Sequence, residues 1–113
     1  MTTIGQLNQF KLPTITIMNK MTEKKFKNLL IGLNVKTKSD LTNLKSLVEN
    51  KIVEVYKQAV LQSAMDVING KYKNITEAPM YRKNDIIYNI PDNVQRWCHF
   101  YGLIEKFEKV ELF

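Results

Sequence analysis

The chain of 113 residues is long enough for one hydrophobic core, so we expect a single domain over residues 1–113. Hydrophobic residues make up 44% and charged residues 25%, which argues against extended disorder, and the formal net charge of +6 indicates an anionic partner. The only cysteine, Cys98, excludes an intrachain disulfide and a cysteine-rich zinc site, and the only histidine, His99, excludes a multi-histidine metal centre.

Residues 12–18 have the pattern of a short strand. The sequence Leu-Pro-Thr-Ile-Thr-Ile-Met puts its threonines on one face and its isoleucines on the other, and β-branched residues favour strands. Pro13 has no backbone N–H to donate, so the strand is expected to lie at a sheet edge or to begin there.

An amphipathic helix with a basic outer face is predicted next. Thr22 is a capping residue with Glu23 in the first turn, and Gly32 is a stop signal. The apolar residues recur at i, i+3, i+4 and i+7 and are Phe26, Leu29, Leu30 and Leu33. The opposite face carries Lys24, Lys25 and Lys27. Residues 34–38 are expected to link this helix to the next.

The strongest helical signal runs from about residue 40 to residue 69. Ser39 and Asp40 supply a start, and no glycine or proline interrupts the apolar period before Asn69-Gly70. At 1.5 Å per residue this helix is about 45 Å long, which indicates that it projects from the domain or supports a homo-oligomer. Its apolar face widens after Val55, which predicts that its C-terminal half is the more deeply buried.

The last third of the chain is harder to assign. Residues 70–84 are polar and contain Pro79, so they are predicted to form a loop, and the apolar run 85–90 is too short to classify. Pro91 and the residues after it signal the start of a helix.

Two alternatives remain open for that final helix. It runs from about 92 to 109 with Gly102 inside, at a cost of about 1 kcal/mol relative to alanine. Alternatively it stops at Tyr101, and residues 103–113 form a turn and a strand. In either case the predicted fold class is α+β and mainly helical, with one long central helix, two shorter helices and one or two short strands.

Nothing in the sequence supports an enzyme. Cys98 and His99 are adjacent, so on a helix they point about 100° apart and cannot form a dyad. We therefore expect Cys98 in the core and His99 on the surface. The carboxylates Glu105, Glu108 and Glu111 resemble a solvated face, and the four glycines are too isolated to form a phosphate loop. No catalytic residue, metal site or cofactor is predicted.

Basic residues gather in two parts of the sequence. Residues 1–38 hold seven lysines against Glu23 alone, and residues 71–101 interleave bases with aromatic residues. This pattern is typical of proteins that neutralise and stack on nucleic acid, although a solvated lysine-rich face is the plain alternative. The residues predicted to contact phosphate are Lys24, Lys25, Lys27, Lys71, Lys73, Arg82, Lys83 and Arg96. Tyr81 or Tyr88 is expected to stack, whereas Trp97 and Tyr101 fit a helix core.

The string Asp-Asn-Val-Gln-Arg-Trp-Cys-His-Phe-Tyr-Gly-Leu-Ile-Glu-Lys, within residues 92–113, resembles the recognition helix and wing of winged-helix DNA-binding domains. The resemblance implies a helix in the major groove and a wing on the DNA backbone. The residues that it would turn toward DNA are Asn93, Gln95, Arg96 and His99. Those that it would turn toward the core are Val94, Trp97 and Tyr101.

The sequence therefore predicts a non-enzymatic, basic, nucleic-acid-associated protein. Fifteen of the 17 basic residues are lysines, which favours sequence-independent backbone contact and leaves DNA and RNA equally open. The alternative is a protein-interaction or assembly subunit. A phage or organelle component is one example, because the abundance of lysine, asparagine and isoleucine is typical of AT-rich coding sequences. The first 18 residues lack the pattern of a secretory signal, and no apolar run is long enough to cross a membrane, so a cytoplasmic location is expected.

Overall fold

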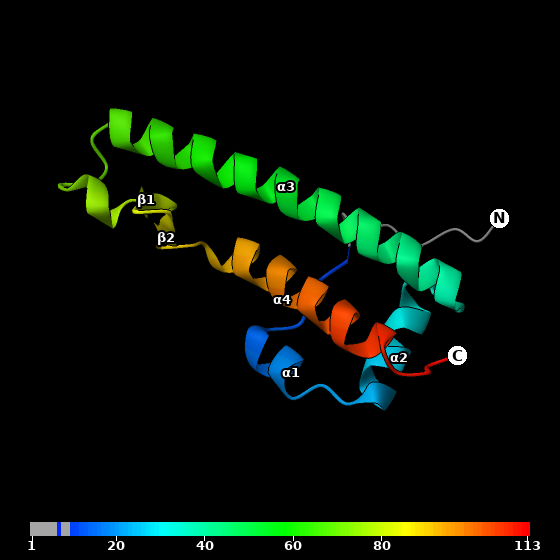
Figure 1. The fold of residues 1–113 in the computed structure, drawn as a ribbon. Helices are drawn as coiled ribbons and strands as arrows, with labels where there is room; N and C mark the ends of the chain where they lie inside the picture. The colour runs from blue at the N-terminus through cyan, green and yellow to red at the C-terminus, as the bar shows by residue number, and fades with distance from the viewer. Residues whose placement is uncertain (1–6, 8–9) are drawn as a thin grey trace.

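A computed structural model describes residue 7 and residues 10–113, so part of the stretch used to judge a secretory signal lies outside the described residues. The predicted fold class is confirmed, because the chain is mainly helical with one long helix and a small antiparallel sheet. The elements are α1 (Ile15–Asn19), α2 (Glu23–Gly32), α3 (Lys38–Ile68), the 3-10 helix η2 (Ile75–Glu77), β1 (Tyr81–Lys83), β2 (Ile86–Tyr88) and α4 (Asp92–Glu108). Figure 1 shows α4 running alongside α3 in the opposite direction, with β1 and β2 beyond the N-terminal end of α4.

The strand prediction for residues 12–18 is wrong, because residues 15–19 form α1. The hydroxyl Oγ1 of Thr14 accepts a hydrogen bond from the backbone N–H of Ile17 at 3.3 Å, which caps the helix. Helix formation also buries Met18, which is 2% exposed, against the core. Local capping and this one buried side chain therefore outweigh the β propensity of the sequence.

α2 begins and ends where the sequence predicts. Thr22 accepts a hydrogen bond from the backbone N–H of Lys25, and the helix ends at Gly32. Asn34 then takes a left-handed conformation with φ 61°, and the backbone N–H of Val35 donates to the carbonyl of Leu30 at 2.9 Å. This pattern is a Schellman motif, and it turns the chain from α2 into α3.

α3 begins with a reciprocal cap. The backbone N–H of Asp40 donates to Thr37 Oγ1, and Asp40 Oδ2 accepts from the backbone N–H groups of Thr37 and Lys36. These hydrogen bonds hold the pKa of the Asp40 carboxyl below its usual value, the bond from Lys36 being the largest cause. At the other end, Gly70 has φ 74° and stops the helix as expected.

The predicted depth of α3 is wrong, because its N-terminal half is the buried half. Leu44 and Val48 are fully buried, whereas Leu61 is 66% exposed and Ile68 is 82% exposed. One reason is that Leu61 and Ile68 lie on the side of α3 facing away from its buried residues, and the other is the unequal length of the two neighbouring helices. α3 has 31 residues and α4 has 17, so the antiparallel partner ends before it reaches the last turns of α3.

The loop prediction for residues 70–84 is wrong in two places, at η2 and at β1. β1 pairs with β2, and Tyr81 lies opposite Tyr88. The two residues between the strands, Asn84 and Asp85, have φ of 53° and 64°, as a two-residue hairpin turn requires. Asparagine and aspartate tolerate this conformation, so the Asn-Asp pair was a hairpin signal in the sequence.

α4 continues through Gly102 to Glu108, so the alternative of a turn and strand after Tyr101 is wrong for residues 103–108. Leu103, Ile104 and Phe107 are buried and extend the apolar face that begins at Val94. Burying three large side chains contributes several times the roughly 1 kcal/mol that the glycine costs. The prediction of one continuous helix is therefore confirmed.

Candidate functional site

The eight predicted phosphate contacts do not form one site. Lys24, Lys25 and Lys27 lie on α2, beside the N-terminal end of α3 (Figure 1). The other five lie toward the opposite end of the molecule, on or near the hairpin and at the start of α4, and are Lys71, Lys73, Arg82, Lys83 and Arg96. The molecule measures 51 Å along its longest axis, and the two groups lie toward opposite ends of it. One small ligand therefore cannot contact both groups.

Three members of the hairpin group have acidic partners. Lys71 Nζ lies 3.6 Å from Asp66 Oδ2, and Arg82 Nη2 lies 3.0 Å from Asp85 Oδ1. Arg96 Nε lies 2.6 Å from an oxygen of Asp92. These carboxylates reduce the positive potential of the hairpin end. Within the part of the chain that the structure describes, Lys73 and Lys83 form no such pair.

The lysines around α2 have a different environment. We call Lys20, Lys24, Lys25 and Lys27 the α2 basic surface. All four side chains are exposed, and none forms a salt bridge with any of the described residues. Lys36 and Lys38 follow α2 and are exposed as well. The lysines of α2 and its flanks are therefore exposed, and a common surface for them stays a prediction.

α2 is fixed to the body of the protein by its apolar face. Phe26 and Leu30 are fully buried, on the side of the helix opposite Lys24, and Lys25 and Lys27 lie on its flanks. The ring of Phe26 stacks on that of Phe107 in α4, with centroids 4.8 Å apart. The α2 basic surface is therefore carried by a docked helix.

The aromatic residues predicted to stack on bases lie far from α2. Tyr81 and Tyr88 pair across the hairpin with ring centroids 6.1 Å apart, and Tyr88 is 43% exposed. Trp97 is buried, as its helical spacing predicts. Tyr101 is half-buried and donates a hydrogen bond from its hydroxyl to Glu49 at 2.7 Å, which raises the pKa of Tyr101 because the carboxylate favours the protonated phenol.

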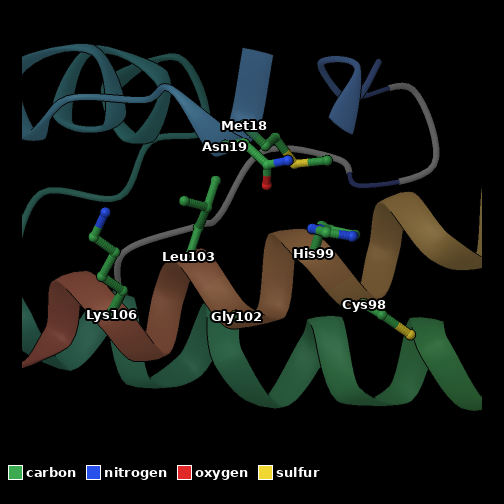
Figure 2. A pocket seen from close by; sticks show the side chains of 7 residues that line it. All are labelled: Met18, Asn19, Cys98, His99, Gly102, Leu103 and Lys106. Atoms are coloured by element: carbon green, nitrogen blue, oxygen red, sulfur yellow. The ribbon is translucent and has the colours of Figure 1, made fainter. Parts of the chain in front are cut away.

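Cys98 and His99 point in different directions from α4, as Figure 2 shows, so they form no dyad. The expectation that Cys98 lies in the core is wrong, because its side chain is exposed. Partial burial still raises the pKa of the thiol, which lowers the fraction of nucleophilic thiolate at neutral pH. Both residues line an open pocket of about 370 Å³ between α1 and α4, together with Met18 and Lys106.

That pocket contains no carboxylate and no second histidine. Among the described residues, no group of three or more histidine, cysteine, aspartate or glutamate side chains is placed to hold a metal ion. The arrangement offers one nucleophile of low reactivity with no base aimed at it. Among the described residues, Cys98 therefore lacks the base that would activate it as a nucleophile.

α4 has part of the arrangement that the winged-helix resemblance implies. Asn93, Gln95 and His99 are exposed, and Val94 is buried. Arg96, which the resemblance turns toward DNA, is half-buried and forms a salt bridge with Asp92 of the same helix. The residues after Gly102 continue the helix, whereas the family has its wing at this point. DNA recognition by α4 remains a prediction, and the segment after Gly102 does not form the wing that the resemblance implies.

A set of exposed apolar residues on the second half of α3 is the feature that sequence reasoning missed. Val53, Val60, Leu61, Met65 and Ile68 are each between 40% and 82% exposed. Their helical spacing suggested a buried face, because periodicity identifies an apolar side without identifying its cover. In Figure 1, α4, β1 and β2 lie on the same side of α3.

Comparisons with known proteins give no assignment, since no protein-family model, no curated protein and no solved structure matches the chain. Over the described residues, no helix has the length and apolar character needed to cross a membrane.

Proposed function

We propose that this protein is a non-enzymatic, nucleic-acid-associated protein that contacts the phosphate backbone through the α2 basic surface. The observation that carries the proposal is the group of four exposed lysines on and beside α2, none of which pairs with an acidic side chain within the described residues. An anionic polymer is the ligand that such a surface attracts most strongly.

The residue types indicate how the surface binds. Lysine attracts phosphate as a point charge and lacks the planar fork with which arginine reads base edges. The one aromatic residue of α2, Phe26, is buried, and the ring of Phe113, which is 42% exposed, lies 6.0 Å from Lys27 Nζ. Binding is therefore sequence-independent, and DNA and RNA compete for the same lysines.

Salt dependence follows from this mode of binding. Each lysine that neutralises a phosphate releases condensed counterions, so the logarithm of the affinity falls with the logarithm of the salt concentration. Four contacts give a slope of about −3 to −4 on duplex DNA. The hairpin lysines Lys73 and Lys83 add to the attraction only when the ligand is long enough to reach both ends of the protein.

The test compares two matched charge reversals by fluorescence anisotropy. Labelled duplex DNA, single-stranded DNA and RNA are titrated with the wild type, with Lys24→Glu/Lys25→Glu and with Lys73→Glu/Lys83→Glu, at several salt concentrations. All four lysines are exposed, so thermal unfolding is expected to be unchanged in both variants. We expect the α2 variant to lose at least tenfold in affinity and the hairpin variant to lose less than threefold.

Two results would contradict the proposal. One is an equal loss of nucleic-acid affinity in both variants, which would mean that the net charge of the protein, and not the α2 basic surface, determines binding. The other is wild-type protein that binds vesicles containing anionic lipid and binds none of the three nucleic acids at low salt.

A second function, that of an assembly subunit, is favoured by the exposed apolar residues of α3. Monomeric proteins rarely expose contiguous apolar patches of several hundred Å², and larger ones mark interaction sites. An assembly role and backbone binding use opposite ends of the molecule, so one does not exclude the other.

A further inference from the structure

The second half of α3 carries an apolar stripe on the side of the helix opposite its buried face. Val53, Val60 and Val67 recur every seven residues, and Lys57 and Ala64 lie four residues after the first two. At 100° per residue Val53, Lys57, Val60 and Ala64 lie opposite Val48 and Val55, which are buried in the core, and the half-buried Val67 lies at the flank of that outer side. We call Val53, Lys57, Val60, Ala64 and Val67 the α3 seam.

The spacing of the seam is that of a coiled coil. Alternation of three and four residues is the a/d pattern with which one α-helix packs against another of the same kind. The seam residues are valine and alanine apart from one lysine, so two backbones can approach closely. Lys57 is the only charged residue of the seam. A single lysine at such a position sets the register of the pairing.

A groove borders the seam on one side. It has a volume of about 440 Å³ and lies between α3 and the segment from η2 to β1. Val60, Ala64 and Val67 of the seam line it, together with the buried Ala78 and Met80. Ile68, which is 82% exposed, also lines the groove, whereas Leu61 lies outside it with 66% of its surface exposed. Groove and protruding side chains are thus on one face, as a two-fold symmetric interface requires.

The exposed area fits a dimer. A wholly buried aliphatic side chain removes roughly 60–120 Å² from water, so the partly exposed Val53, Val60, Leu61, Met65, Ile68 and Ile75 present roughly 200–400 Å². A standard interface buries about 800 Å² per partner, of which somewhat more than half is apolar. These six side chains therefore supply roughly half or more of the apolar part of such an interface.

Charge selects the direction of pairing. An antiparallel pair centred near Gln62 sets Val60 against Ala64 of the second copy and Lys57 against Val67. It also brings Glu54 of one copy beside Lys71 of the other, an attractive contact that occurs twice by symmetry. Both side chains are more than half exposed, and each also pairs within its own chain, Glu54 with Lys51 at 3.5 Å and Lys71 with Asp66 at 3.6 Å. A parallel pair instead sets Lys57 against itself, which is repulsive.

We propose that two copies of this chain associate through their α3 seams in an antiparallel, two-fold symmetric arrangement. The pairing covers the exposed half of α3 that α4 does not reach. It leaves both α2 basic surfaces uncovered, one toward each end of the dimer. This proposal stands on the apolar face of α3 and does not depend on nucleic-acid binding.

Analytical ultracentrifugation of the full chain tests the association, with a matched pair of variants. Leu61→Glu puts a carboxylate beside the seam, and Leu47→Glu puts the same change on an exposed position in the first half of α3. We expect the wild type and Leu47→Glu to sediment at about twice the 13.2 kDa of the single chain at 50 μM, and Leu61→Glu to sediment as a monomer. Circular dichroism melts show whether each variant is folded. A wild type that remains monomeric, or two variants that behave alike, overturns the proposal.

Cysteine pairing tests the direction, in a background that carries Cys98→Ser. Protein with Glu54→Cys is mixed with protein with Ile68→Cys and mildly oxidised. The antiparallel arrangement predicts a disulfide between the two different variants, whereas a parallel one gives each variant a disulfide with itself. Predominance of the self-paired products would rule out the antiparallel arrangement even if the protein is a dimer.

Discussion

The ring of Phe26 in α2 stacks on the ring of Phe107 in α4, with centroids 4.8 Å apart and 22° between the planes. Phe26 is 0% exposed and Phe107 is 4% exposed. This contact joins the helix that carries the basic surface to the last turns of the C-terminal helix. The position of the lysines therefore depends on a pair of residues 81 positions apart in the sequence.

The first prediction concerns this stacked pair. Phe26→Ala leaves a cavity under α2 and removes an aromatic contact, so we expect a loss of about 3–5 kcal/mol in the free energy of unfolding, measured with urea. Ile31→Ala, on the same helix but 54% exposed, is the control and is expected to cost well under 1 kcal/mol. Similar losses in the two variants would show that α2 is not docked as described.

The second prediction concerns pH. Hydrogen bonds from Lys36 and Thr37 lower the pKa of the Asp40 carboxyl, so the ionised form is favoured in the folded state. The resulting stability is present above the unfolded pKa of about 4 and is lost as the pH falls through the lower, folded value. We expect the melting temperature to fall below pH 4 in the wild type.

Asp40→Asn isolates this effect, because an amide does not ionise. The variant is expected to be less stable at pH 7 and to lose less stability between pH 4 and pH 2. Thr37→Ala removes the hydroxyl of the same cap and is expected to cost about 1 kcal/mol at neutral pH. If the melting temperature of Asp40→Asn falls as steeply below pH 4 as that of the wild type, other carboxylates cause the acid sensitivity.

The third prediction compares two glycines. A Cβ at Gly102 meets nothing within 4 Å and the residue is helical, so Gly102→Ala is expected to stabilise the protein by about 0.4–1 kcal/mol. Gly70 has equal space but a φ of 74°, so Gly70→Ala is expected to destabilise it by about 1 kcal/mol. Thermal melts measure both. A Gly102→Ala variant that is less stable than the wild type would mean that α4 bends or ends at this residue.

The fourth prediction concerns the one charge in the α3 seam. Lys57→Leu removes an ammonium group from the dimer interface, so we expect the dissociation constant to fall at least tenfold, equivalent to about 1.4 kcal/mol. Lys73→Leu, an exposed change outside the seam, is the control and is expected to leave the constant unchanged. Sedimentation equilibrium measures both, and an effect of equal size in the control would show that general hydrophobicity drives association.

Local signals in the sequence predicted the helices well. α2 starts after Thr22 and ends at Gly32, and α3 ends before Asn69-Gly70. These boundaries were predictable because capping and left-handed turns depend on neighbouring residues alone. The strand predicted at residues 12–18 failed because a cap at Thr14 and the burial of Met18 decided the outcome. The alternation of threonine and isoleucine in the sequence does not indicate either contact.

What depends on long-range packing was not predictable. The exposure of Leu61 and Ile68 follows from the side of α3 on which α4 packs, and α4 starts more than 20 residues later in the chain. The candidate phosphate contacts divided because α3 separates Lys27 from Lys71 by its whole length. Basic composition led to the prediction of an anionic ligand, whereas α3 determines which of the lysines lie at the same end of the molecule.

The unequal cover of α3 has a consequence for its backbone. Turns around Leu44 and Val48 are held by α4, so their amide protons exchange with solvent only when much of the protein opens. In a single copy, the last turns before Ile68 have fewer packed neighbours and open by local fraying. One uninterrupted helix thus spans a rigid segment and a labile one, and exchange of its amides for deuterium should report, residue by residue, where the first ends and the second begins.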